Sequence, residues 1–437
     1  MIKKILLLCL CVAVVFSFSS CNLMMADTAE LLSSPSLPDE LKPIADIIGK
    51  TAPEGYTLKY PSRGEYRSAI IRHDIDGDGF EEAFAFYYTA EGEAGAMHIN
   101  LIAKRKGNWS LVAEQKILAG GVDKVEFSDL NSDGVKEILV GWEIYGTSEM
   151  QLAVYSLDAT GLTQMLLERY THFLACDLDE NRQDEILVIK SASKEAGNSA
   201  VLYGFQKGSV TALSSCALDS AAKTINEPII APLSTGKQVA YIEEIKGIGA
   251  ITEVLIYEKG VLKNPLYSAD FKETVKTLRS VSLPTTDING DGILEIPVQE
   301  NVPSVAIGAA TEILYLTNWC SFDGESLTIQ QTSMINILDG YMLNIPAKLI
   351  GKIAILKNTQ TRERGIYLYD SETLTVGDNL FTIQSMEEKE WDTIKKKGTA
   401  AKELATADET VHIAFISNLA TSYGITFDGL KEAITTF

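Results

Sequence analysis

Cysteine and histidine are scarce in this chain of 437 residues, which holds six cysteines and four histidines. Cys9 and Cys11 lie in the apolar N-terminal stretch, so beside Cys21 the rest of the chain keeps only Cys176, Cys216 and Cys320. So few cysteines cannot form a disulfide framework, and we expect them to be buried with at most one pair. The histidines, His73, His98, His172 and His412, show no spacing typical of metal ligands.

Common catalytic signatures are also missing. There is no Gly-x-Ser-x-Gly elbow, phosphate-binding loop or Cys-His signature. Adjacent acids such as Glu243 and Glu244 could serve a glycosidase, but at this charge density we expect them to lie solvated on the surface. The sequence therefore favours a non-catalytic protein over an enzyme.

Positive charge is in deficit. The chain has 38 Lys and Arg against 59 Asp and Glu, a formal net charge of −21, which becomes −23 if Lys3 and Lys4 are removed with a leader. Because binding to phosphate backbones needs clustered Lys and Arg, nucleic acid is not an expected partner.

The N-terminus indicates export. Lys3 and Lys4 precede an apolar stretch over residues 5–18 that ends in Ser19, Ser20 and Cys21. This is typical of a signal peptide over residues 1–20, too short and too early for a membrane span. Small residues before a cysteine resemble a bacterial lipobox, with Phe18 where that motif usually has Leu. The resemblance implies lipidation of Cys21 and an anchor on the outer face of the bacterial cytoplasmic membrane; ordinary secretion or an uncleaved anchor are the alternatives.

Four acidic loops of nine residues, 74–82, 129–137, 177–185 and 287–295, are the main positive feature. Oxygen side chains occupy positions 1, 3 and 5, and a glutamate occupies position 9: Asp74, Asp76, Asp78, Glu82; Asp129, Asn131, Asp133, Glu137; Asp177, Asp179, Asn181, Glu185; Asp287, Asn289, Asp291, Glu295. Oxygens converging in a tight loop suit Ca²⁺. Polar turns, in which Asp and Asn bond their own backbone, are the simpler alternative. An EF-hand is excluded because position 12 is Ala or Val and a strand follows rather than a helix.

The spacing of the loops predicts repeats. Their first positions are 55, 48 and 110 residues apart, so we expect one more repeat near residue 232, where residues 231–238 form a loop without acids before an apolar strand. A sixth degenerate loop is expected over residues 344–352. Six hairpins support this count, near residues 101–109, 153–162, 202–208, 255–261, 314–324 and 367–374.

Each repeat supplies four short strands: one before the loop, one after it and the hairpin pair. His73 and His172 are expected to line the strands before their loops. Four-stranded units of about 50 residues predict a mainly β fold, a propeller of six blades with seven as the alternative count. We expect Trp109, Trp142, Tyr145 and Trp319 to serve the core or the hairpins.

Two segments lie outside the repeats. Residues 21–60 are expected to be a tether with one short amphipathic helix that carries Leu41, Ile44, Ile47 and Ile48. Residues 379–437 are expected to be a small α/β cap. It would have a strand at 380–383, a helix opened by Ser385 and Glu388 and ended at Gly398, a second helix from Thr406 to Gly424, and a third with Leu430 and Ile434. The propeller would occupy residues 61–378.

The position-9 glutamate directly before an apolar strand resembles the FG-GAP or VCBS repeats of integrin α-subunit propellers. The resemblance covers roughly residues 68–375 and implies that positions 1, 3, 5 and 9 of the four acidic loops ligate Ca²⁺, with the carbonyl at position 7 completing the shell. Because all ligands come from one loop, such a site would staple a turn rather than leave a position open for substrate.

The sequence thus predicts a lipid-anchored surface protein that binds an extracellular protein or glycan without catalysis. The alternative is an extracytoplasmic enzyme that acts on polysaccharide, because propeller scaffolds also serve such chemistry.

Overall fold

The computed structural model describes residues 38–90, 95–105, 107–193, 196–307 and 314–437, with only the backbone described over 304–307. The predicted signal peptide, Cys21 and residues 21–37 of the predicted tether lie outside these residues. No helix in the described part is long and apolar enough to cross a membrane.

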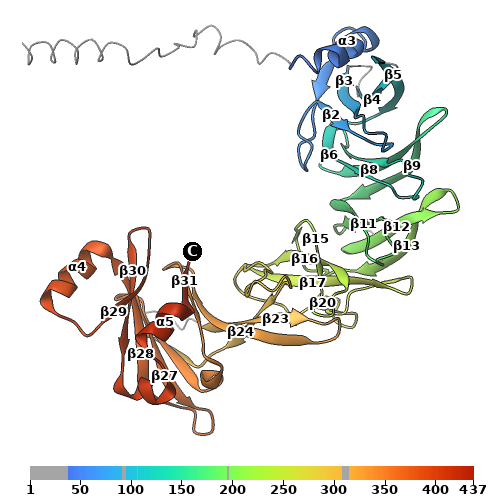
Figure 1. Cartoon of the computed structure of the whole chain (residues 1–437). Helices are drawn as coiled ribbons and strands as arrows, with labels where there is room; N and C mark the ends of the chain where they lie inside the picture. The colour runs from blue at the N-terminus through green and yellow to red at the C-terminus, as the bar shows by residue number, and fades with distance from the viewer. Residues whose placement is uncertain (1–37, 91–94, 106, 194–195, 308–313) are drawn as a thin grey trace, which may run out of the picture.

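The structure is mainly β, as predicted, and most of it consists of antiparallel sheets that follow one another along the chain (Figure 1). The first three sheets each contain a meander of four strands. Their strands are β1 (Thr57–Lys59), β2 (Ile70–His73), β3 (Glu82–Thr89), β4 (Ala96–Arg105) and β5 (Asn108–Ile117) in the first sheet; β6 (Gly121–Ser128), β7 (Glu137–Glu143), β8 (Met150–Asp158) and β9 (Gly161–Tyr170) in the second; and β10 (His172–Cys176), β11 (Glu185–Lys190), β12 (Ser199–Gln206) and β13 (Ser209–Ala217) in the third.

The fourth and fifth sheets continue this pattern with additions. The fourth contains β14 (Thr224–Ile225), β15 (Ile229–Pro232), β16 (Gln238–Lys246), β17 (Gly249–Glu258) and β18 (Val261–Lys263), followed by a two-stranded ribbon of β19 (Tyr267–Ser268) and β20 (Glu273–Thr274). The fifth contains β21 (Ile296–Asn301), β23 (Tyr315–Phe322), β24 (Leu327–Asn336), β25 (Tyr341–Asn344) and β31 (Ile434–Thr436).

The sixth sheet is the widest. Its order is β22 (Ser304–Ile307), β26 (Ile353–Asn358), β27 (Glu363–Asp370), β28 (Thr375–Glu387), β30 (Thr410–Ile416) and β29 (Lys402–Ala407), and β22 pairs with β26 in parallel. The chain therefore crosses from the fifth sheet to the sixth and back between β21 and β23.

The strand after each acidic loop is apolar because both of its faces are covered. In β7, for example, Ile138 and Val140 pack toward the first sheet, whereas Leu139 packs toward the third. Such strands read as continuous apolar runs rather than as alternating patterns. All six predicted hairpins are present, as β4–β5, β8–β9, β12–β13, β17–β18, β23–β24 and β27–β28.

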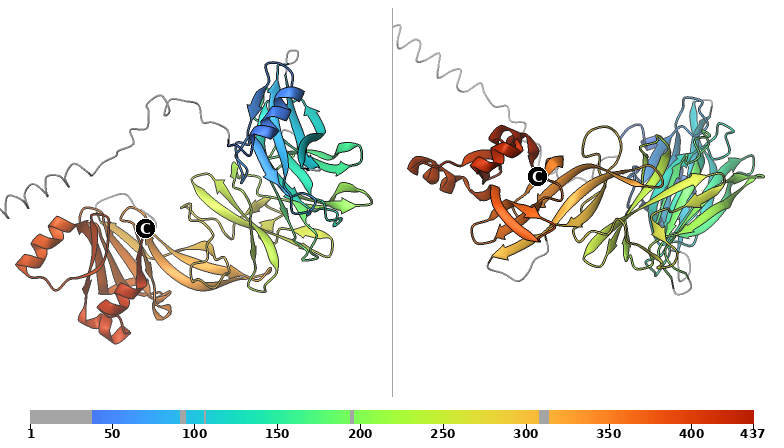
Figure 2. Two further views of the ribbon diagram at one scale, coloured as in Figure 1. Left: turned by 45° about the horizontal axis from the view of Figure 1, so that its top comes forward. Right: turned by 90° about the horizontal axis from the view of Figure 1, so that it is seen from below.

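The row of sheets is open. Figures 1 and 2 show the first and sixth sheets at opposite ends of a curved array. Helix α3 (Lys42–Thr51), which was predicted from its apolar spacing, buries Ile44 and Ile48 against Ala83 and Ala85 on the face of the first sheet that points away from the second. In a closed ring the last blade would pack on this face, so the structure confirms the mainly β fold but not the predicted closed propeller of six or seven blades.

The C-terminal stretch corrects one predicted helix. Helices α4 (Glu388–Lys397) and α5 (Phe427–Ala433) are present, and α4 ends before Gly398 as predicted. The predicted opening by Ser385 is wrong, because Ser385 lies in β28 and bonds to His412, and no side chain caps the start of α4. The predicted helix from Thr406 is wrong: β29 and β30 form a hairpin there, with Asp408 in the left-handed region at φ 51°, followed by a 3₁₀ helix (Asn418–Tyr423). Thr406 and Glu409 flank a hairpin turn rather than opening a helix.

Strands within residues 379–437 join the fifth and sixth sheets instead of forming a sheet of their own. Strand β28 runs through residue 378, where the predicted propeller meets the predicted cap. Ile434, predicted on the last helix, begins β31, which pairs with β25.

Candidate metal-binding loops

The four acidic loops occupy equivalent places in their sheets. The first three join β2 to β3, β6 to β7 and β10 to β11, and the fourth lies between the bridge partners Thr286 and Glu295, directly before β21. As predicted, His73 and His172 belong to the strands β2 and β10. Each acidic loop therefore joins the first two positions of a meander, the arrangement that the sequence repeat predicts.

The loops share one hydrogen-bond pattern. The carboxylate at position 1 accepts a hydrogen bond from the backbone amide of position 6. The side-chain oxygens at positions 3 and 5 accept from the amides of positions 5 and 7, respectively. The glutamate at position 9 accepts from the amide of position 2. In the first loop these bonds are Gly79 N to Asp74 at 3.0 Å, Asp78 N to Asp76 at 3.2 Å, Phe80 N to Asp78 at 2.8 Å and Ile75 N to Glu82 at 3.2 Å. The equivalent bonds in the second, third and fourth loops are 2.6–3.2 Å long.

The backbone is also the same in all four. Positions 4 and 6 have positive φ in every loop: Gly77 and Gly79, Ser132 and Gly134, Glu180 and Arg182, Gly290 and Gly292, with φ from 60° to 88°. Left-handed backbone is strained for a side chain other than glycine. Ser132, Glu180 and Arg182 nevertheless adopt it, which indicates that the surrounding bonds hold the loop in one form.

The four position-9 glutamates, Glu82, Glu137, Glu185 and Glu295, are buried at the base of their loops. Burial raises the pKa of each, and nearby loop carboxylates raise it further, in Glu185 to about 7. Each loop thus gathers a glutamate in a poorly solvated place beside two or three other acidic or amide groups.

The four loops differ in which groups lie beside their negatively charged side chains. In the first loop one carboxylate oxygen from each of Asp74, Asp76 and Asp78 lies within 4.8 Å of the others, and in the third loop Asp177, Asp179 and Glu185 are equally close. Three carboxylates at such distances repel one another unless a cation lies between them. These donor sets fit Ca²⁺, which prefers carboxylate oxygens.

The second and fourth loops have asparagine at position 3. Asn131 Nδ2 donates to Glu137 at 2.9 Å, and Asn289 Nδ2 donates to Asp291 at 3.0 Å. In each of these two loops, a side-chain amide therefore offsets part of the negative charge of a carboxylate. In the second loop Asp129 Oδ1 is buried and has no hydrogen-bond partner among the described residues. That oxygen is suited to a cation.

Consecutive loops contact one another through the position-2 carbonyl. The carbonyl of Ile75 accepts from Lys136 N at 2.7 Å, and that of Leu130 accepts from the Gln183 side chain. The carbonyl of Leu178 accepts from Lys237 Nζ at 3.3 Å. Lys237 belongs to the acid-free loop over 231–238, which joins β15 to β16 where the repeat predicts a loop. The loops therefore form a chain of contacts along the first four sheets.

A separate acidic cluster corrects the prediction for Glu243 and Glu244. Neither lies solvated on the surface: Glu243 is half-buried and bonded to Arg279 at 3.0 Å, and Glu244 is fully buried on β16. Glu244 lies near Glu253 of β17, also fully buried, and neither oxygen of Glu244 receives a hydrogen bond from a described residue. Burial raises the pKa of both carboxyls, so Glu244 keeps a proton that it can donate to Glu253.

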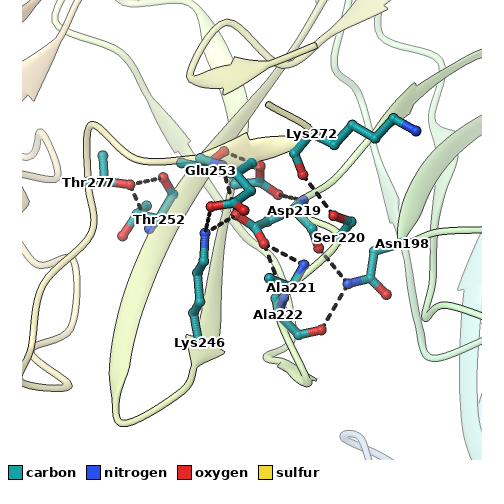
Figure 3. Close-up of polar contacts among 12 residues, drawn as sticks. Asn198, Asp219, Ser220, Ala221, Ala222, Lys246, Thr252, Glu253, Lys272 and Thr277 are labelled. Carbon is teal, nitrogen blue, oxygen red and sulfur yellow. Dashed lines mark hydrogen bonds and ion pairs between the residues drawn. The ribbon is translucent and has the colours of Figure 1, made fainter. Parts of the chain in front are cut away.

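Hydrogen bonds connect the other members of this cluster (Figure 3). Asp219 accepts from Lys246 Nζ at 2.9 Å and from Thr274 N at 2.7 Å, and Glu253 accepts from Asn264 at 2.9 Å. Asn198, at the start of the third sheet's β12, donates to the carbonyl of Asp219 at 2.7 Å. The cluster thus joins the third sheet, the fourth sheet and the ribbon.

The sequence carried a signal for this cluster. Glu244 follows Ile242 by two positions, and Glu253 follows Ile251 by two, so alternation along β16 and β17 places both acids on a buried face. The acid Asp219 lies outside any strand, and only the tertiary structure brings it to them.

The cysteines and aromatics follow expectation in part. Cys176, Cys216 and Cys320 are free, with Cys176 and Cys320 buried. Trp142 and Trp319 are core residues, whereas Tyr145 is 52% exposed.

Comparisons with known proteins find similar solved structures only. No protein-family description and no curated protein matches the chain. Three solved structures match over most of their length: a protein assigned as a 6-phosphogluconolactonase from Bacteroides uniformis (10% identity, 70% of this chain and 82% of that one, TM-score 0.30), the exotype rhamnogalacturonan lyase YesX (11%, 76% and 84%, 0.30), and the periplasmic gluconolactonase PpgL of Pseudomonas aeruginosa (13%, 75% and 88%, 0.28). At these TM-scores the likeness carries no argument about this chain.

Proposed function

We propose that this chain is a non-catalytic binding or scaffold protein outside the bacterial cytoplasmic membrane, held there by a lipid on Cys21 and stapled by Ca²⁺ in its acidic loops. The observation that carries the proposal is the loop geometry, repeated four times with the same hydrogen bonds and the same two left-handed positions.

Calcium would act here as a structural staple. Its ligands would be the side chains at positions 1, 3, 5 and 9 of each loop, with the first and third loops favoured because each brings three carboxylates together. Since each loop touches the next, an ion in one loop would also stiffen the contact between neighbouring sheets. The partner would be an extracellular protein or glycan, which an extended row of sheets can contact over a long surface.

The alternative, an enzyme that acts on polysaccharide, needs an accessible pair of carboxylates. Glu244 and Glu253 do not supply such a pair, because both are fully buried. These two acids therefore support a structural role rather than the enzyme.

Metal analysis tests the staple. In protein from residue 28 onward, we expect bound Ca²⁺ with a dissociation constant on the order of 10⁻⁴ to 10⁻³ M or tighter. Saturation about 100-fold above that constant would stabilise the fold by about 2.7 kcal/mol, so EDTA should lower the Tm. The double substitution Asp74→Asn and Asp78→Asn should remove the ion from the first loop and reduce the effect of EDTA.

A matched control is Asp46→Asn with Asp270→Asn, which removes the same charge from exposed positions outside the loops. This variant should bind as much Ca²⁺ as the unsubstituted protein. If EDTA leaves the Tm unchanged and elemental analysis finds no Ca²⁺, the metal proposal is contradicted and the loops are polar turns.

Glycan arrays and pull-downs with surface extracts, each run with Ca²⁺ and with EDTA, test the binding role. We expect a partner retained only with Ca²⁺. Turnover of a polysaccharide by the purified protein would contradict a non-catalytic role.

A further inference from the structure

A cavity of 450 Å³ lies where the fifth and sixth sheets meet, far along the chain from the acidic loops of the first three sheets. Its wall is mostly apolar and includes Val281, Leu283, Tyr315 and Met334. Volumes of this size are typical of sites for small organic ligands.

Arg364, on β27, is the single charged residue among those that line this cavity. It is only 7% exposed. Its Nη2 donates to Asn336 Oδ1 at 3.1 Å, but its buried Nε has no hydrogen-bond partner, and no ion pair joins Arg364 to a carboxylate within the described ranges. A buried guanidinium with five donors and no anion is costly, which points to an anionic ligand.

The nearby carboxylate of Asp339 is already bonded to Arg362 Nε at 2.6 Å and to Asn336 Nδ2 at 2.7 Å. Within the described part of the chain, this carboxylate therefore does not pair with Arg364.

The part of the cavity wall that contains Ser280, Leu283 and Gln299 is held in place by hydrogen bonds within the protein. Arg279 exchanges two backbone hydrogen bonds with Ala250, each 2.9 Å long, and its Nε donates to the carbonyl of Leu283 at 2.8 Å. Gln299 Oε1 accepts from both the amide and the hydroxyl of Ser280, at 2.6 and 2.8 Å. A preformed wall reduces the ordering cost of binding.

We propose that this cavity binds a small organic monocarboxylate, whose carboxylate pairs with Arg364 and whose apolar body lies against Val281, Leu283 and Met334. A carboxylate can take a bidentate pair of hydrogen bonds from a guanidinium, and the apolar wall selects a hydrophobic body over a bare inorganic anion.

The test is isothermal titration calorimetry on the chain from residue 28 to its C-terminus, with phenylacetate and hexanoate as ligands. The corresponding primary amides and inorganic phosphate serve as the comparison probes. We expect saturable binding of at least one of the two carboxylates at one site, with the amides and phosphate at least about tenfold weaker, since a charge-assisted pair contributes that much or more.

Arg364→Gln should weaken carboxylate binding about tenfold or more, whereas Arg169→Gln, which changes an exposed arginine of the second sheet, should leave it unchanged. Leu338→Asp provides a variant that does not depend on a core substitution, because Leu338 lines the cavity and is 82% exposed. An added carboxylate there should weaken binding severalfold without lowering the Tm.

Equal binding of amides and carboxylates, unchanged binding in both Arg364→Gln and Leu338→Asp, tighter binding of phosphate, or no binding of any probe at millimolar concentration would each overturn the proposal. None of the residues that line the cavity belongs to an acidic loop, so substitutions in the first acidic loop and substitutions in the cavity test the two proposals separately.

Discussion

At the residue scale, the acidic loops show backbone geometry that overrides side-chain preference. Arg182 occupies the position that glycine fills in the other three loops, with φ 72° against 86° to 88°, and its side chain is exposed. The third loop nevertheless keeps the shared hydrogen bonds, so the strain lies at Arg182 itself.

Arg182→Gly should therefore stabilise the protein. Left-handed backbone costs a side-chain-bearing residue about 1 kcal/mol relative to glycine, so the Tm in EDTA should rise by roughly 2 °C or less. The reverse change in the second loop, Gly134→Arg, adds a Cβ that would meet no neighbouring atom within 4 Å, so the left-handed backbone alone should lower the Tm by a similar amount. A fall in Tm for Arg182→Gly would show that the arginine side chain stabilises the loop.

The second prediction at the residue scale concerns how the stability contributed by Glu244 depends on pH. Its folded pKa is raised above the unfolded value, so the folded state retains a proton that the unfolded state loses. Its contribution to stability is complete below the unfolded pKa of about 4.3 and is lost progressively as the pH rises from there through the higher folded value.

Glu244→Gln, which imitates the protonated acid, should raise the Tm at pH 8 to 9 and change it little near pH 4. A gain of about 1 kcal/mol in the free energy of unfolding would correspond to roughly 2 °C or less in Tm. The exposed Glu409→Gln is the control and should show no such pH dependence. A Tm difference that is constant from pH 4 to 9 would contradict a shared proton.

At the element scale, polar bridges between sheets accompany the apolar cores. Asp123, on β6, is 1% exposed and accepts from Arg63 Nη2 at 2.7 Å and from the hydroxyl of Tyr170 at 2.6 Å. Burial would raise its pKa, but hydrogen bonds from Arg63 and Tyr170 outweigh it and lower the pKa. The bridge fixes the segment before β2 against the second sheet.

Arg63→Ala should cost about 3 kcal/mol at pH 7, because it leaves a buried carboxylate without its cation. Since the Asp123 pKa is lowered on folding, its contribution is present above the unfolded value of about 3.9 and is lost as the pH falls. The deficit of the variant should therefore shrink below pH 4. Arg67→Ala, on an exposed arginine four residues away, should leave stability unchanged in urea melts; equal losses in both variants would refute the bridge.

At the scale of the whole molecule, an open row of sheets implies that the free energy of unfolding differs from one sheet to another. Each sheet packs mainly on its sequence neighbours, so the ends need caps, and α3 supplies one at the first sheet. Burial of Ile44 and Ile48 there excludes water from strands β2 to β4.

Ile44→Ala with Ile48→Ala should cost about 2 to 5 kcal/mol for each side chain. In hydrogen exchange, protection should fall in the first sheet while the sixth sheet stays unchanged. Lys50→Ala, on the exposed face of the same helix, should alter neither. Equal loss of protection in the first and sixth sheets would indicate a closed, fully cooperative ring instead of an open row.

Local sequence signals determined the features that depend on neighbouring residues. The acidic loops, the six hairpins, α3 and α4 all follow from turn residues, alternation or helical spacing over a few positions. The loop over 231–238 could be placed without its acids because the repeat length fixes where a turn must come.

The tertiary structure alone decided what depends on distant segments. The pairing of β22 with β26, the burial of Glu244 beside Asp219 and Glu253, the strand at 410–416 and the open ends of the row each require a surface supplied by residues far away in the chain. The sequence by itself thus determined the repeating unit and its acidic loops, because turns and strand patterns are local. Only packing between units decided whether they close, which charges are buried and where the cavity lined by Arg364 arises.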